Sequence, residues 1–558
     1  MTESVNPHVQ ALQASTILVF HPGSRNLRFG RASDAQPETI IHAIARRRNH
    51  GQSGTSCSKN IHHDSLIPLG ARKIISKFPP EVESARLQLC HTLQTSLKTD
   101  GSPRYATPSQ QIAAYNKRSK IEIISEDIPA RKDFNGRSFV VGDDVFDVDS
   151  NEFNIHFPWR RGQPNIHEGI GGSISSVFTD LEVIWSSCIA EKLDIPIKDL
   201  KHYKAVVIVP VMFDRVHARE MLNLVLNRLG FGMAFLLQDH VSATFGCGLA
   251  AATVVDVGDQ KISVSCVEDG ISFPQSRIEL KYGGGDLTLA LWNLLSQCAV
   301  PFNIDLTCPW DVNFLAAMKE KFCHFDLNRC GPEEQTILWN KPGDIVKSYN
   351  ILLGDELLVV PLSFFNPDLL KGSVSSHSVV VTQRAFTQTH LSDDPFDAVF
   401  ISETSRRGLK EAEGDVEDDF IDENKDHENS IEKTNKIDTD QLLGIEQAIL
   451  QSIESCSFNE ELKRRMYSSV LIVGGGFKFK GLGPWLQNKI SMNTPRIFKT
   501  DPQEVITQPK DGDSALTCWK GAAILSCLET AHELWIKQSE WITCGSRVLR
   551  ERSLSGLL

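Results

Sequence analysis

The chain has 558 residues, of which 41% are hydrophobic and 23% are charged, and this composition is ordinary for a globular protein with a sizeable core. It contains no run of about eighteen apolar residues and begins without a basic-then-apolar signal pattern, so we expect an intracellular protein with no membrane span. The net charge of −12 argues against a uniformly basic nucleic-acid surface. The 13 cysteines, without a close CxxC pair, indicate neither a disulfide framework nor a zinc site.

The first predicted element follows a short tail of residues 1–14. Residues 17–20 form an apolar strand, residues 22–24 (Pro-Gly-Ser) mark a turn, and a return strand then carries the basic Arg28. Successive backbone N–H groups in such a turn form an anion-binding concavity, and glycine lets the backbone approach a phosphate closely. The sequence therefore predicts a hairpin whose tip can bind an anion.

The next part of the chain alternates between helices and strands, which indicates a mixed α/β sheet with crossover helices. Before this alternation, residues 49–104 are polar or weakly periodic. The predicted elements are a helix over 81–92, a short basic helix within 105–120, a half-buried helix over 173–193, a strand over 205–209 and a helix over 217–229.

A second hairpin is predicted where residues 251–255 form an apolar strand that ends in Asp256, Gly258 and Asp259. The strand that follows alternates apolar and polar residues from Ile262. A carboxylate beside a phosphate-binding turn can hold a magnesium ion, directly or through a water molecule. This hairpin thus combines an anion site with two acidic side chains.

Between residues 411 and 440 there are 13 acidic and 3 basic residues, which contribute −10 of the net charge and predict a solvated insertion. An amphipathic helix over 442–453 leads back into the fold. Residues 470–476 then form a strand and a glycine turn, and a helix follows over 482–490. Taken singly, each of the three glycine turns is more often simple turn chemistry than a ligand site.

The order and surroundings of these turns resemble actin and the actin-related proteins. The sequence HPGSRNLRFGRASDAQP (residues 21–37) aligns without a gap on the first phosphate loop of actin, and residues 256–259 resemble the second. Residues 280–288 resemble the strand-to-helix step that follows, residues 318–323 the helix that contacts the nucleoside, and residues 519–541 the C-terminal signature. The resemblance covers most of the chain.

It implies an α/β, actin-like bilobed ATPase-domain fold, in which two related mixed-sheet lobes face a nucleotide cleft, with insertions. The expected outer lobe spans residues 15–250 and is enlarged by an insertion at about 49–104. The inner lobe spans 251–511 and contains an acidic insertion at 385–440. Residues 512–558 are expected to return to the outer lobe.

The resemblance also implies ATP or ADP as the ligand, with magnesium held by Asp256 through water. The residues expected to contact the nucleotide come from both phosphate loops, the nucleoside helix and the third glycine turn. They are Gly23, Ser24, Arg25, Arg28, Asp256, Gly258, Asp259, Gly284, Lys319, Glu320, Gly474, Gly475, Gly476 and Phe477.

The chain departs from actin where hydrolysis would occur. His21 replaces an aspartate near the metal, and Ser263 replaces the histidine near the attacking water. Asp239 falls where actin has the glutamine that orients that water, although a shift of one residue would restore Gln238. Because water activation needs a group within hydrogen-bond reach, we expect no catalytic residues and slow or absent hydrolysis. Two alternatives are an empty cleft, and an active ATPase or kinase with Asp239 as the base.

A narrower resemblance points to a nuclear family member found in chromatin-remodelling complexes of the INO-eighty type. Residues 154–167 (NIHFPWRRGQPNIH) and 530–541 (TAHELWIKQSEW) are among the segments that carry it. It implies a nuclear scaffold subunit that binds a helical segment of the remodelling ATPase, actin and another actin-related protein, and that engages nucleosomes and DNA in transcription and repair. Because insertions would obstruct filament packing, we expect no filaments. No single basic cluster is assigned to DNA.

Overall fold

The computed structural model describes residues 13–48, 64, 66–67, 79–105, 107–125, 132–149, 152–371, 379–386, 442–499, 501–509 and 512–552. The predicted tail lies outside these residues except for its last two positions. The predicted acidic insertion lies outside them after residue 386, and so does most of the stretch from 49 to 78. No described helix is both long and apolar enough to span a membrane.

One six-stranded sheet is built from both ends of the chain, in the order β21-β11-β10-β1-β2-β3. Strands β1, β2 and β3 form an antiparallel meander, and β10 and β11 run parallel to β1 on its other side. β21 closes the edge beside β11. The strands are β1 (Ile17–Pro22), β2 (Asn26–Arg31), β3 (Glu38–Ile41), β10 (Lys204–Val209), β11 (Met233–Gln238) and β21 (Ile536–Lys537).

A second sheet repeats this plan in the order β18-β15-β13-β12-β19-β20, with β14 paired to β13. β12 and β13 form a hairpin, β15 continues the meander, and β19 runs parallel to β12. The strands are β12 (Ala251–Val257), β13 (Ile262–Glu268), β14 (Ile271–Ser272), β15 (Ile278–Leu280), β18 (Val380–Thr382), β19 (Ser469–Val473) and β20 (Glu504–Ile506). Two sheets with the same plan place the β1–β2 and β12–β13 hairpins in equivalent positions.

Helices α6 (Asp239–Cys247) and α15 (Thr517–Ser526) connect the two sheets. One apolar cluster contains side chains from these helices and from strands of both sheets. The indole Nε1 of Trp519 donates to the backbone oxygen of Val19 over 3.1 Å, and the Ser242 hydroxyl donates to the backbone oxygen of Cys518. The C-terminal segment is therefore packed directly against the first strand of the chain.

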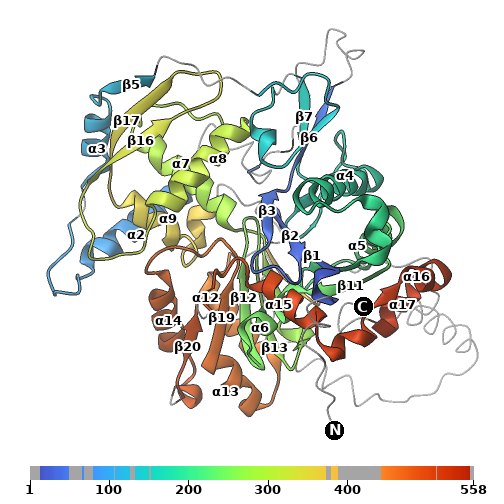
Figure 1. Ribbon diagram of the computed structural model, residues 1–558. Coiled ribbons are helices and arrows are strands. Elements are labelled where there is room, and N and C mark those ends of the chain that lie inside the picture. Colours follow the sequence, from blue (N-terminus) through green and yellow to red (C-terminus); the bar gives the residue numbers. More distant parts are fainter. Residues whose placement is uncertain are drawn as a thin grey trace, which may run out of the picture.

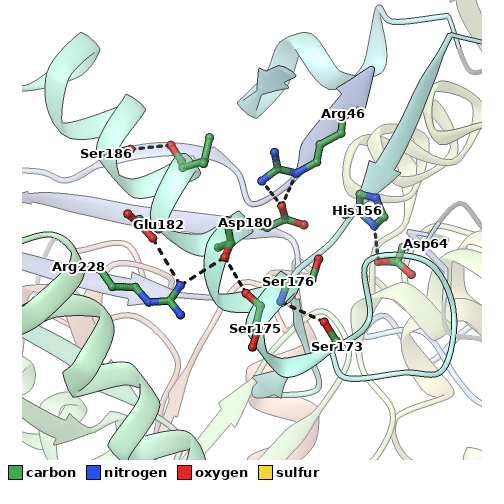
Figure 2. A network of polar contacts seen from close by, with 12 residues as sticks. Arg46, Asp64, His156, Ser173, Ser175, Ser176, Asp180, Glu182, Ser186 and Arg228 are labelled. Carbon is green, nitrogen blue, oxygen red and sulfur yellow. Dashed lines mark hydrogen bonds and ion pairs between the residues drawn. The ribbon is translucent and has the colours of Figure 1, made fainter. Parts of the chain in front are cut away.

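Helix α4 (Ile174–Lys192) covers the first sheet and is held by a network of polar contacts (Figure 2). Ser173 caps its N-terminus by accepting from the backbone N–H of Ser176, as residues of this type commonly do. Arg46 reaches from β4 (Ile44–Arg47) and donates to the buried Asp180 over 2.5 Å. The contact between Arg46 and Asp180 fixes α4 to the small sheet β6-β4-β7, which includes β6 (Phe139–Val141) and β7 (Phe153–His156).

The position of residues 79–125 differs from the one expected from the sequence. We expected the insertion at about 49–104 to enlarge the outer lobe. Asp64 and Ile67 do bond to residues 155–165 of that lobe, but the described residues from 79 to 125 pack on the inner-lobe side. Strand β5 (Ile121–Ser125) joins β17 (Val346–Leu353) and β16 (Glu333–Trp339) in one sheet, and Figure 1 shows α2 (Pro80–Thr95) and α3 (Ser109–Asn116) on that same side.

Specific buried contacts hold this segment in place. The amide of Asn116 donates to the backbone oxygen of Cys298 over 2.9 Å and accepts from the backbone N–H of Leu352 over 2.7 Å. Arg104 forms a buried ion pair with Asp355 at 3.0 Å. Buried polar groups need such partners, so these bonds select the inner-lobe position over a solvated one.

The remaining described elements cover the sheets or join them. They are β8 (Trp159–Arg160), β9 (Gln163–Pro164), α5 (Arg215–Asn223), α7 (Gly284–Gln297), α8 (Pro309–Phe322), α9 (Glu356–Leu362), α12 (Ile445–Cys456), α13 (Glu460–Ser468), α14 (Leu482–Asn493), α16 (Gln538–Cys544) and α17 (Arg547–Arg552), with short 3-10 and π turns between them.

Candidate functional site

A cavity of about 470 Å³ lies where the turns of the β1–β2 and β12–β13 hairpins face each other. The first turn contributes residues 22–26 and the second contributes residues 258–261. Residues 474–476, which follow β19, and Lys319 and Glu320 of α8 are also part of the lining. The three glycine turns singled out in the sequence are thus brought to one place by the repeated sheet plan.

The structure places every residue expected to contact nucleotide in the lining of this cavity except Phe477. Phe477 is 6% exposed, and its ring lies 5.8 Å from that of Phe364 in the hydrophobic core. The expectation for Phe477 is therefore corrected: the next two residues, Lys478 and Phe479, line the cavity instead.

The third glycine turn is crowded on one side and open on the other. A Cβ on Gly474, which has φ of +88°, would lie 2.3 Å from the backbone oxygen of Val257. A Cβ on Gly475 would contact only Ala515, at 3.9 Å. Glycine is thus required at 474 to bring the third turn against the second hairpin, whereas the space beside Gly475 remains for a ligand.

Two cations expected from the sequence are buried in this lining. The Nε of Arg28 is buried without a hydrogen-bond partner among the described residues, and burial lowers the pKa of Arg28. The ammonium of Lys319 donates to the backbone oxygen of Gly284 over 2.6 Å and to the hydroxyl of Thr288 over 2.9 Å. Because a buried charge without a partner is costly, the free Nε of Arg28 marks a place suited to an anion.

A third cation, Lys261, was not expected from the sequence. It is the last residue of the turn in the β12–β13 hairpin, and its ammonium lies 3.4 Å from a carboxylate oxygen of Asp239, the first residue of α6, directly after β11 of the other sheet. Burial alone would lower the pKa of Lys261, but Asp239, Glu279 and Asp256 together outweigh this effect and raise it. Burial would raise the pKa of Asp239, but the charge of Lys261 and a hydrogen bond from the backbone N–H of His240 hold it below its usual value. Both groups are therefore charged, and the ion pair joins the two sheets at the base of the cavity.

The sequence left two candidates, Asp239 and Gln238, for the position of actin's glutamine, and the two differ in their relation to the cavity. Asp239 lines it, whereas Gln238 is the last residue of β11 and is buried outside the lining. Of the two candidate side chains, the carboxylate and not the amide therefore faces the cavity.

Three buried histidines, His21, His42 and His240, surround the two hairpins. Burial lowers the pKa of His21 to about 3, assisted by Arg28, and lowers the pKa of His42 and of His240 to about 4. His42 contacts the backbone oxygen of Gly23 through Nδ1 at 2.9 Å and so fixes the first turn. At neutral pH all three are uncharged and weakly basic.

His240 lies behind the cavity, close to Ser263. Its Nε2 is 3.0 Å from the hydroxyl of Ser263, and its Nδ1 is 2.7 Å from the hydroxyl of Ser265. It does not line the cavity. The imidazole therefore lies beside Ser263, the residue expected at the position of actin's histidine, but it contacts two serines and is separated from the cavity.

The donor set does not fit magnesium held by Asp256 as we expected. Burial, with a contribution from Asp239, raises the pKa of Asp256 to about 6. Within the described ranges no group of three or more His, Cys, Asp and Glu side chains could hold a metal ion. Of the other carboxylates in the lining, Asp239, Asp259 and Glu320, the first is already paired with Lys261, whose ammonium lies beside Asp256 in the same lining. Since magnesium requires oxygen ligands in octahedral geometry, an ammonium beside them is unfavourable.

One further contact crosses the cavity at its mouth. The guanidinium of Arg25, in the first hairpin turn, donates to the side-chain oxygen of Asn313 on α8 over 2.7 Å. Arg25 and Asn313 therefore join the two halves across the cavity, as Asp239 and Lys261 also do.

Comparison with known proteins agrees with this arrangement. The family model for actin matches residues 12–323 and 363–553. The chain is 42% identical to actin-related protein 8 of Aedes aegypti, over 97% of this chain and 98% of the relative. It is 34% identical to actin-related protein 8 of Homo sapiens, over 97% of this chain and 93% of the relative. A solved structure, human actin-related protein Arp8 in its ATP-bound state, superimposes with a TM-score of 0.80 at 33% identity, and 99% of each chain is covered.

The chain belongs to the actin family, and the expected α/β actin-like fold is confirmed. Within that family, its similarity over nearly its full length is to actin-related protein 8.

Proposed function

We propose that the cavity binds ATP or ADP as a structural ligand and that hydrolysis is slow or absent. The observation that carries the proposal is the pairing of an intact phosphate-binding cradle with altered groups where water would be activated. The cradle consists of the facing glycine turns and the partnerless Nε of Arg28. The ATP-bound state of a solved relative supports this ligand.

Each part of the cavity has a chemical role in this proposal. Backbone N–H groups of the hairpin turns donate to phosphate oxygens, and Arg28 supplies a charge-assisted hydrogen bond. Lys319 and Glu320 lie on the helix that we expect to contact the nucleoside. Because these groups come from both sheets, a bound nucleotide stabilises the closed arrangement, by about 2.7 kcal/mol at a hundredfold excess over the dissociation constant.

Slow hydrolysis follows from the bases near the cavity. A general base works best with a pKa near the operating pH. The pKa of His21 is lowered to about 3, which leaves it too weakly basic for this task. The carboxylate of Asp239 is paired with Lys261, so its oxygen is less available to a water molecule.

We further propose that the protein is a nuclear scaffold subunit of a chromatin-remodelling complex of the INO-eighty type. The expected partners are a helical segment of the remodelling ATPase, actin, another actin-related protein, and nucleosomes with their DNA. The proposal extends to transcription regulation and DNA repair, without filament formation. Its support is the similarity to actin-related protein 8 together with the segment 79–125, which adds β5 to the periphery of the fold.

A single-turnover assay with purified full-length chain and ATP tests the non-catalytic role. We expect phosphate release slower than about one event per minute, well below the median enzyme turnover of about ten per second. Faster release would favour the alternative of an active ATPase or kinase, for which the observation that Asp239 lines the cavity is the support. In that case Asp239→Asn would abolish the release.

Affinity purification from nuclear extract tests the assembly. We expect a remodelling ATPase and actin to co-purify with the tagged chain. Recovery of the chain without either protein, from extract in which both are present, would contradict the scaffold proposal.

A further inference from the structure

We propose that the ammonium of Lys261 takes the place of a divalent cation, so that the cavity binds a nucleoside triphosphate without magnesium. This inference rests on the proposed function, since it assumes that nucleotide binds in the cavity. It specifies the form of the ligand: the free triphosphate anion, neutralised by fixed side chains of the chain itself.

The position of Lys261 is fixed by the backbone around it. Its own backbone oxygen accepts a hydrogen bond from Gly258 over 2.9 Å, which closes the hairpin turn. Its side chain packs on Gly162, where a Cβ would lie 3.0 Å from Cε of Lys261 and 2.9 Å from Pro210. Gly162 has φ of +75°, so it provides both the turn between β8 and β9 and the space for the lysine.

The ammonium reaches the cavity beside the groups that would otherwise hold a metal. It lies 3.4 Å from Asp239 and 3.5 Å from the hydroxyl of Ser263, and it lines the cavity together with Asp256. A divalent ion between these carboxylates would be within a few ångströms of the ammonium, where like charges repel strongly in a water-poor site.

The fixed side chains also supply positive charge without a metal. Five cations (Arg25, Arg28, Lys261, Lys319 and Lys478) and four carboxylates (Asp239, Asp256, Asp259 and Glu320) line the cavity, so its side chains carry a formal net charge of +1. Arg28 retains a free Nε, and Lys261 has three donors of which Asp239 and Ser263 engage two at long distance. Both side chains can therefore donate to phosphate oxygens.

The test is a titration of the full-length, nucleotide-free chain with ATP, by calorimetry, once with excess EDTA and once with excess magnesium. The variants are Lys261→Met, which removes the charge, and Lys261→Arg, which keeps it. Lys463→Met is the matched control, because Lys463 pairs with Glu454 outside the cavity. The double variant Asp239→Asn with Lys261→Met avoids an unpaired buried carboxylate if the single variant does not fold.

For the wild-type chain we expect the two affinities to agree within about threefold, a difference worth well under one charge-assisted hydrogen bond. Lys261→Met, or the double variant, should weaken binding in EDTA by at least about tenfold. Lys261→Arg and the control should remain metal-independent. The inference is overturned if EDTA weakens wild-type binding by about tenfold or more, or if Lys261→Met binds like the wild type in EDTA, which would leave Lys261 as an ion-pair residue only. Failure of the wild type to bind ATP in both conditions would instead refute the proposed function.

Discussion

Replacing Asp256 with asparagine should stabilise the nucleotide-free protein. Asp256 ends β12 at the cavity and is 9% exposed. Burial and the neighbouring charge of Asp239 raise its pKa to about 6 from an ordinary value of 3.8. Asparagine has nearly the same shape but cannot ionise, so the substitution isolates the cost of the charge.

The raised pKa gives the size and the direction of the effect. The shift of Asp256 is about two pKa units, and one unit is worth about 1.4 kcal/mol, so the ionised carboxylate costs about 3 kcal/mol. A group whose pKa is raised by folding stabilises the folded state fully when the pH is below its pKa in the unfolded state. This stabilisation is lost as the pH rises through its pKa in the folded state. Asp256→Asn should therefore equal the wild type near pH 4 and exceed it by about 3 kcal/mol near pH 7.

Urea unfolding of the nucleotide-free chain at several pH values measures this difference directly. Asp368→Asn serves as the control, because Asp368 is exposed on the surface and its substitution should change stability by no more than about 0.5 kcal/mol. The reasoning is refuted if Asp256→Asn is less stable than the wild type near pH 7, or if its advantage does not grow between pH 4 and pH 6.

Three other predictions concern packing, closure and acid stability. Gly521→Ala should lower the free energy of unfolding by about 1–3 kcal/mol, because the new Cβ would clash with the backbone oxygen of Ser242. Gly475→Ala is the control and should not lower it, because a Cβ there has open space. Equal stability of the two variants in urea would contradict this prediction. Arg25→Ala removes the hydrogen bond to Asn313 across the cavity and should speed release of a fluorescent ATP analogue by about tenfold in stopped-flow measurements. An unchanged release rate would exclude a role of this bond in closing the cavity. The three buried histidines have lowered pKa values, so the free energy of unfolding should fall by about 4 kcal/mol per pH unit as the pH drops below 6.5. Protonation of Asp256, whose pKa is raised, offsets about 1.4 kcal/mol per pH unit of this loss below pH 6. A midpoint of urea unfolding that does not fall between pH 6 and pH 5 would show that these imidazoles are not buried.

Much of the cavity could be predicted because its signals are local. A glycine turn beside an apolar strand is visible within about ten residues, and the turns at Gly23, Gly258 and Gly474 all reach the cavity. Phe477 was misplaced because the chain turns after Gly476, which directs that ring into the core and the next side chains to the cavity.

Lys261 could not be assigned in the same way. Its role depends on Gly162, on Asp239 and on its own hairpin, which lie far apart in the sequence and meet only when both sheets are assembled. No periodicity or spacing connects these positions. The available signal was a basic residue directly after the second phosphate loop, and it acquires meaning only beside the altered residue at 239.

The location of residues 79–125 was mispredicted for a related reason. Chain order places them after the first strands of the outer lobe, which suggested that they enlarge it. The contacts that decide their position are made by single polar residues such as Asn116, whose partners Cys298 and Leu352 come from the other lobe. Such long-range pairings carry no local pattern.

The central claim is that the chain holds a triphosphate without cutting it, and the chemical identity of the retained nucleotide tests it most directly. The purified full-length chain would be incubated for hours with ATP and magnesium, freed of unbound nucleotide, denatured and analysed by ion-exchange chromatography. We predict intact ATP in a molar amount close to that of the chain. Recovery of mainly ADP, or of no nucleotide at all, would contradict the account.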